Sequence, residues 1–120
     1  MKKLILIVDA GGKPGVLSPH GEFDIEIAGI RGFLEVAEKD RMEIQVINSA
    51  EGVEANPELQ AVIFMSTSME ATAERIKQAR PDVNVIMLRG QVGFMHNDQV
   101  IFLDRQWVTP EVIHRIVTYR

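Results

Sequence analysis

Asp9 is the residue of this sequence best placed to do chemistry. It ends the run Lys3-Leu-Ile-Leu-Ile-Val-Asp9, which is apolar at every position between its two charged ends. Such a run predicts an interior strand of a parallel sheet that helices cover on both faces. Asp9 would then lie at the carboxyl edge of the sheet, where open α/β folds collect ligands and reactive groups. The alternative is an aspartate that caps its own loop by bonding to the amides of Gly11 or Gly12.

The loop after Asp9 is rich in glycine and could bind an anion. Backbone amides at Gly11 and Gly12, together with the ammonium group of Lys13, are suitable donors for a phosphate. The spacing matches neither the dinucleotide fingerprint nor the P-loop, and Pro14 removes one donor. A small ligand- or nucleotide-binding module that uses this loop is therefore the alternative function.

Alternating strands and helices must position these residues. Further buried strands are predicted over residues 43–48, 59–65, 83–88 and 99–103, and a single helical turn within 49–57. Helices are predicted from Asp24, from a capping box of Thr67 and Glu70, and from Thr109-Pro110-Glu111. The pattern predicts an α/β three-layer sandwich with a central, mostly parallel five-stranded sheet. In the last helix, the predicted buried stripe comprises Val112, Ile113, Ile116 and Val117.

The segment between Leu88 and the strand 99–103 is too short for an ordinary helical crossover, which needs about a dozen residues. We expect a hairpin in which residues 92–95 pair with 100–103, or else a short crossover without a helix. Either would leave apolar surface uncovered around Phe94, Met95 and Trp107, which are candidate protein-interface residues. The alternative for Trp107 is that it folds back onto the core.

Length and composition narrow the classes of function. The 120 residues predict one domain, 1–120, and 46% hydrophobic residues are enough for a core. A net charge of −4 argues against a nucleic-acid partner. The chain has no cysteine, and its three histidines lie on different predicted elements, so no metal site is expected. Because no stretch is long enough to span a membrane, we expect a cytoplasmic protein without a membrane partner.

Several stretches, in order, resemble the receiver domains of response regulators over about two thirds of the chain. The first strand through Asp9 is similar to the receiver's first strand, and residues 49–55 to the segment after its second strand. The best match is Glu74-Arg-Ile-Lys-Gln-Ala-Arg-Pro-Asp-Val-Asn-Val-Ile-Met-Leu88, which resembles the third helix and fourth strand. Residues 102–111 resemble the fifth strand and the start of the last helix. The resemblance implies a flavodoxin-like fold whose fourth helix is reduced or replaced by a hairpin.

The departures from the receiver pattern bear on function. Asp9 is followed by Ala10 where a receiver has an acidic pair, and one carboxylate holds Mg²⁺ poorly. The third strand runs into Met65-Ser-Thr without the phosphate-accepting aspartate. Arg89 ends the fourth strand where the resemblance implies a hydroxyl residue, and Arg105 ends the fifth in place of lysine. Either arginine could pair with Asp9, turning a phosphate site into a salt bridge, and both are candidate ligand-binding residues.

These observations predict a non-enzymatic regulatory or assembly domain, a pseudo-receiver that cannot be phosphorylated in the usual way. We expect it to bind a protein partner or itself, as a homodimer through residues 90–107 and the last helix, and to need no cofactor. A metal-dependent nuclease is a further hypothesis, since Asp9 ends a strand reading I-V-D-A. Such a site needs several converging acids. Glu70, Asp98 and Asp104 are the available candidates, and their predicted positions do not converge.

Overall fold

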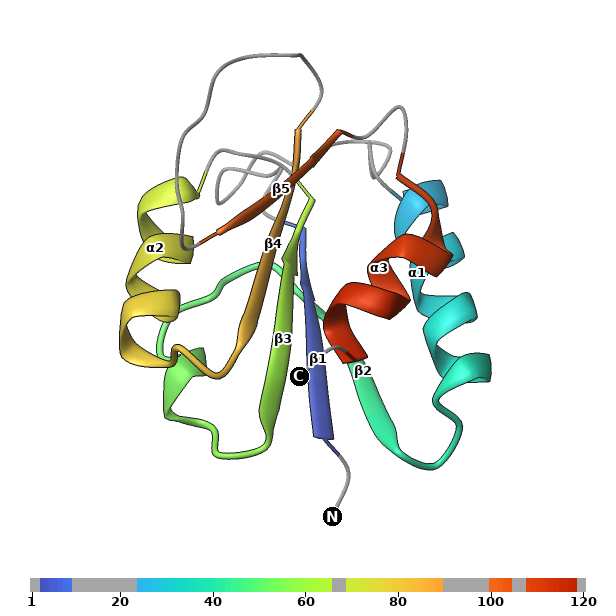
Figure 1. Cartoon of the computed structure of the whole chain (residues 1–120), viewed down its shortest axis with the longest axis horizontal. Helices are drawn as coiled ribbons and strands as arrows, with labels where there is room; N and C mark the ends of the chain where they lie inside the picture. The colour runs from blue at the N-terminus through green and yellow to red at the C-terminus, as the bar shows by residue number, and fades with distance from the viewer. Residues whose placement is uncertain (1–2, 10–23, 66–68, 90–99, 105–107, 119–120) are drawn as a thin grey trace.

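The computed structural model describes residues 3–9, 24–65, 69–89, 100–104 and 108–118, with Asp24 and Arg89 described by their backbone alone. Strands and helices alternate along the chain (Figure 1). In order they are β1 (Lys3–Val8), α1 (Asp24–Ala37), β2 (Met42–Ile47), the 3₁₀ turn η1 (Val53–Ala55), β3 (Leu59–Phe64), α2 (Glu70–Ala79), β4 (Asn84–Arg89), β5 (Ile101–Asp104) and α3 (Pro110–Thr118).

The strands form one five-stranded sheet in the order β2-β1-β3-β4-β5, and every neighbouring pair is parallel. The predicted α/β sandwich with a parallel sheet is thus confirmed. β1 is an interior strand, as predicted, although β3 rather than β1 lies in the middle of the sheet. Val8 is in register with Ile47 on one side and Phe64 on the other, so these three strands end at a common edge.

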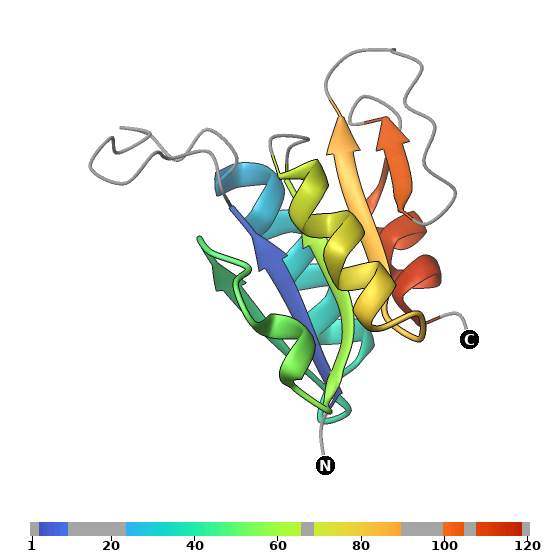
Figure 2. The ribbon, with the colours of Figure 1, turned by 90° about the vertical axis from the view of Figure 1, so that its left-hand side faces the viewer.

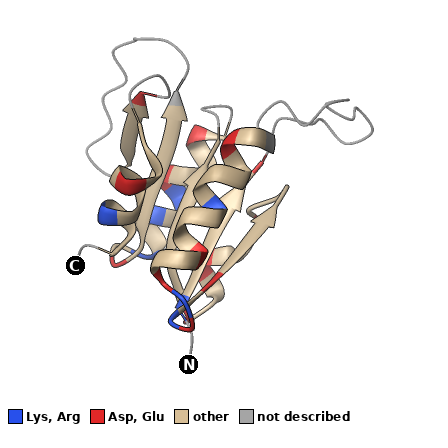
Figure 3. Ribbon diagram, turned by 90° about the vertical axis from the view of Figure 1, so that its right-hand side faces the viewer, with Lys and Arg blue, Asp and Glu red and all other residues tan. Residues whose placement is uncertain are grey.

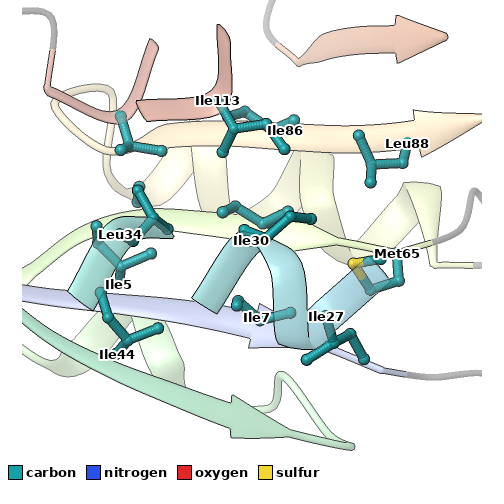
Figure 4. Close-up of a cluster of buried hydrophobic side chains, with 13 residues drawn as sticks. Ile5, Ile7, Ile27, Ile30, Leu34, Ile44, Met65, Ile86, Leu88 and Ile113 are labelled. Carbon is teal, nitrogen blue, oxygen red and sulfur yellow. The ribbon is translucent and has the colours of Figure 1, made fainter. Parts of the chain in front are cut away.

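Two hydrophobic layers flank the sheet. β1 contributes to both, because consecutive residues of a strand face opposite sides and Leu4 to Val8 are all apolar. Ile5 and Ile7 face the layer that α1 and α3 cover, shown in Figure 4. Leu4, Leu6 and Val8 face the opposite layer, which α2 covers in part. This alternation is the period of a strand buried on both faces.

The inner face of α1 is apolar, and its residues Ile27, Ile30 and Leu34 are buried. The predicted start of α3 is confirmed. Thr109 Oγ1 accepts a hydrogen bond from the Val112 N–H at 3.3 Å, and Pro110 takes the first helical position. Near the other end of α3, Gln60 Nε2 donates to the carbonyl of Val117 at 2.7 Å.

Two details of the helices differ from prediction. Val112 is 39% exposed rather than buried, because it lies about 100° around the helix from Ile113, which is buried. The helix α2 begins at Glu70, with Met69 in the N-cap position and no side-chain cap, so the predicted capping box is wrong. Thr67 itself lies outside the described residues.

The connection from β2 to β3 contains no α-helix over residues 48–58, all of which the structure describes. Between β2 and β3 the single predicted turn is confirmed as η1. β5 pairs with β4 in parallel. The predicted hairpin arm 92–95 lies outside the described residues. Among the helices of the described ranges, none combines the length and apolar character needed to cross a membrane.

Candidate functional site

The carboxyl edge of the sheet brings Asp9 next to the end of β3. The Asp9 N–H donates to the carbonyl of Ile47 at 2.8 Å, and the Met65 N–H donates to the carbonyl of Val8 at 3.1 Å. Both bonds continue the ladders of β1, so Asp9 and Met65 follow adjacent strands at one edge. The position of Asp9 at this edge is as predicted.

Met65 is the first residue after β3, and its side chain is fully buried. Figure 4 shows it within the cluster on the α1 side, which also contains Ile27, Ile30 and Leu88. A thioether has no ionisable oxygen and cannot be converted to an acyl-phosphate. The residue beside Asp9 on the neighbouring strand is therefore an apolar core residue.

Most of the other sequence-predicted site residues lie outside the described part of the chain. Gly11, Gly12, Lys13, Arg105, Phe94, Met95 and Trp107 lie outside the described residues, as does Asp98. Arg89 ends β4 in register with Asp104 of β5. β3 separates β1 from β4, and the ends of β1 and β5 are three strand spacings apart, about 14 Å. Within the described ranges, no group of three or more acidic or histidine side chains could hold a metal ion.

A buried carboxylate that is not among the sequence-predicted site residues connects the end of α1 to α3. Glu38 is 8% exposed. Its Oε1 lies 2.7 Å from His114 Nε2, and its Oε2 lies 3.3 Å from Arg41 Nε. The ring of His114 also meets that of Phe33 edge to face, with centroids 5.8 Å apart. The signal available in the sequence was the four-residue spacing from Leu34, which puts Glu38 just past the end of α1 on the side that the helix buries.

The chemistry of this cluster is that of a helix-to-helix contact. A carboxylate and an imidazole can share a proton, but catalysis would also need a nucleophile or substrate site within reach. Phe33, which meets the His114 ring, and Arg41, which pairs with Glu38, supply neither. We assign Glu38 and His114 to the docking of α3 on α1.

A groove of about 340 Å³ lies on the other face of the sheet, over β1 and β2. Leu4 and Leu6 form its floor, and Ile47 and Val53 narrow it. Its rim is polar and is made by Gln45, Ser49, Glu51, Gly52 and Asn56. The sequence predicts only a single helical turn within residues 49–57, because a groove depends on which strands lie beneath that stretch.

The outer wall of the groove, residues 49–56, is held by Arg80. Its Nη1 donates to the carbonyls of Glu54 at 3.1 Å and Asn56 at 2.8 Å, and its Nη2 to that of Leu59 at 3.4 Å. The same guanidinium bonds both carboxylate oxygens of Asp82. These bonds lower the pKa of Asp82 and raise that of Arg80. Ala50, fully buried, anchors the start of the wall.

The solvent-facing side of α1 carries an apolar stripe. Ile25 is 90% exposed and Val36 is 81% exposed. Gly29 and Gly32 lie between them on the same face, each with no atom within 4 Å of where a Cβ would be. Figure 3 shows this side of the molecule, with the acidic and basic residues of α1 coloured and its uncharged residues in tan. We call Ile25, Gly29, Gly32 and Val36 the α1 stripe.

Comparison of the sequence with protein-family models and with curated proteins gave no match. Among solved structures, the chain is similar to the crystal structure of a two component transcriptional regulator AraC from Clostridium phytofermentans ISDg. The TM-score is 0.62 at 15% sequence identity, and the match covers 94% of this chain and 86% of that chain. With the all-parallel strand order, this likeness shows that the chain has a flavodoxin-like, receiver-like α/β fold.

Proposed function

We propose that this chain is a non-enzymatic regulatory or assembly domain that acts through protein contacts and does not accept phosphate on an aspartate. The observation that carries the proposal is Met65, buried after β3 and adjacent in the sheet to Asp9. In a receiver-like fold, phosphorylation needs an aspartate after the third strand and a cation held by an acidic pair. The sequence supplies Met65-Ser-Thr-Ser after that strand and Ala10 beside Asp9.

Incubation with acetyl phosphate and Mg²⁺ is expected to leave the protein unmodified. Without the acceptor carboxylate no acyl-phosphate can form, and a single acid binds Mg²⁺ weakly. Intact-mass spectrometry before and after hydroxylamine treatment measures this, with a phosphorylatable receiver treated in parallel as the positive control. A hydroxylamine-sensitive phosphoryl adduct on this chain would overturn the proposal.

The α1 stripe supports a function in protein contacts, and we propose a second copy of this chain as its occupant. Ile25 and Val36 lie at equal distances from the glycine pair, so the stripe is self-complementary. In a two-fold antiparallel pair of α1 helices, Ile25 of one copy would lie against Val36 of the other, and the glycines would allow close approach. One helix pair buries less than the roughly 1,200 Å² of a stable interface, so the association should be weak.

Sedimentation equilibrium is expected to show an apparent mass that rises with protein concentration. Replacing both Ile25 and Val36 by serine should weaken association by about tenfold, because it removes most of the apolar area at the contact. The matched control is Val112→Ser, which removes an exposed valine from α3. Trp107→Ala tests whether the flank at Phe94, Met95 and Trp107 contributes, as the sequence predicts. A strict monomer at millimolar concentration would contradict the dimer.

A further inference from the structure

We propose that the groove over β1 and β2 binds a helix of a partner protein whose apolar side chains are flanked by lysine or arginine. The inference rests on the proposed function, because it names a partner for a domain that acts through protein contacts. It concerns a different face of the sheet from the α1 stripe.

The space exists because one crossover lacks a helix. A connection between parallel strands usually covers the sheet with a helix of its own. Here β2 and β3 are joined by residues 48–58, which contain only the 3₁₀ turn η1. On this face α2 packs against β4 and η1. Figure 2 shows η1 alongside β1 and β2, with α2 further along the sheet. The part of the sheet over β1 and β2 is where a helix from outside can pack.

The floor of the groove is suited to apolar anchors. Leu4 and Leu6 close it from below, and both belong to the hydrophobic cluster on this face. Ile47 and Val53 pack against the same cluster but are only partly buried. The volume of about 340 Å³ is at the small end for small-molecule pockets. It suits the side chains that an amphipathic helix inserts at positions i, i+3 and i+4.

The rim favours a basic partner. Glu51 lines the groove and is exposed. Glu43 is also exposed, and it shares the face of β2 with Gln45 and Ile47 because strand side chains alternate.

The described cations of α2 and of the turn that follows it already have partners. Arg75 Nη1 lies 2.9 Å from Glu54 Oε1, and Arg80 is bonded to Asp82. Lys77 Nζ donates to the carbonyls of Pro81 and Val83. Glu51 at the rim, and Glu43 in register with Leu4 of the floor, can therefore attract the cations of a partner helix.

The groove is preorganised for binding. Arg80 clamps the carbonyls of Glu54 and Asn56, and the side-chain oxygen of Asn56 accepts a hydrogen bond from the Glu58 N–H at 2.8 Å. The Leu59 N–H donates to the Asn56 carbonyl at 3.1 Å. A wall held by this many bonds loses little conformational entropy when a partner binds.

A pair of synthetic helical peptides of about 15 residues tests the inference. Both carry leucine at i, i+3, i+4 and i+7. At the positions that flank the leucines, one peptide has lysine and the other has glutamate. Titrated into the full chain, the lysine peptide should shift the NMR methyl signals of Leu4, Leu6, Ile47 and Val53. The glutamate peptide should bind about tenfold more weakly, and added salt should reduce this difference.

Two substitutions on adjacent residues of β2 locate the binding. Gln45→Trp fills the groove and should weaken binding of the lysine peptide by at least about tenfold. Val46→Trp is the matched control, because Val46 is exposed on the opposite face of the same strand, and it should leave binding unchanged. Glu51→Lys should lower affinity for the lysine peptide and raise it for the glutamate peptide.

Three outcomes would each overturn the inference. The two peptides could bind equally well, Gln45→Trp and Val46→Trp could have equal effects, or the methyl signals of the groove could fail to shift. None of these outcomes depends on phosphorylation or on the mass measured by sedimentation. Failure of the groove assignment is therefore distinguishable from failure of the proposed function.

Discussion

Replacing Met65 by aspartate is expected to unfold the domain rather than create a phosphate acceptor. The Met65 side chain is fully buried among residues such as Ile27, Ile30 and Leu88. A carboxylate at this point would lose its hydration without gaining a partner in that cluster, and it would stand next to Asp9 in the sheet. We expect a loss of at least about 4 kcal/mol, comparable with the whole stability of a small domain, about 5–15 kcal/mol.

Urea denaturation followed by circular dichroism measures this loss. Met65→Leu conserves volume and apolarity, so it should cost less than about 1.5 kcal/mol and serves as the control. If Met65→Asp instead folds with nearly the stability of the unsubstituted chain, the residue is not the core element described here. The basis of the proposed function would then be lost, because an acid could occupy this position.

Arg80→Ala is expected to be the second large effect, with a loss of about 3 kcal/mol in the free energy of unfolding. The guanidinium donates to three carbonyl groups, those of Glu54 in η1, of Asn56, and of Leu59 at the start of β3, and also pairs with Asp82. Its side chain is 21% exposed, so water can replace only part of these bonds. Removing it takes a donor away from all three carbonyls, of which that of Asn56 keeps its bond from the Leu59 N–H, and frees the wall of the groove.

Denaturation of Arg80→Ala beside Arg31→Ala tests this expectation. Arg31 forms an exposed pair with Glu35 on one helix, which should contribute only about 0.3–0.5 kcal/mol. Equal losses in the two variants would show that Arg80 is an ordinary surface arginine. The peptide titration repeated with Arg80→Ala should also show weaker binding, since the groove wall is no longer held.

The pH dependence of this contact follows from Asp82. Its pKa is lowered in the folded state, chiefly by the hydrogen bonds from Arg80. The stabilisation is therefore present above the unfolded pKa, near 3.9, and is lost as the pH falls through the lower folded value. The stability difference between the unsubstituted chain and Asp82→Asn should be greatest near neutral pH and should vanish in strong acid. Asp82 is largely exposed, so the difference should be small.

Much of the fold could be predicted from local patterns. The run from Leu4 to Val8 is apolar at consecutive positions, which only a strand buried on both faces requires. Thr109 and Pro110 determine where α3 begins, because a capping hydroxyl and a fixed φ act within one turn. The absence of an aspartate from Met65-Ser-Thr-Ser, which follows β3, is likewise a property of the sequence.

Other features depend on pairings that sequence periodicity does not encode. Val112 was predicted to be buried and is exposed, because burial depends on the direction from which α1 and the sheet approach the helix. Glu38 and His114 are far apart in the sequence, and only the docking of α3 on α1 brings them to 2.7 Å. Arg80 likewise reaches the carbonyls of Glu54, Asn56 and Leu59 only because α2 packs beside η1.

The sequence by itself therefore determined that this chain is a parallel α/β domain with a carboxylate, Asp9, at the end of its first strand. It also shows Ala10 after Asp9 and Met65-Ser-Thr-Ser after β3, the departures from a receiver on which the proposed function rests. Only the tertiary structure decided that the Met65 side chain is fully buried beside the end of β1. It also decided that a groove lies over Leu4 and Leu6. The reason is physical: strand and cap signals act over a few residues, whereas burial and grooves arise where segments distant in the sequence meet.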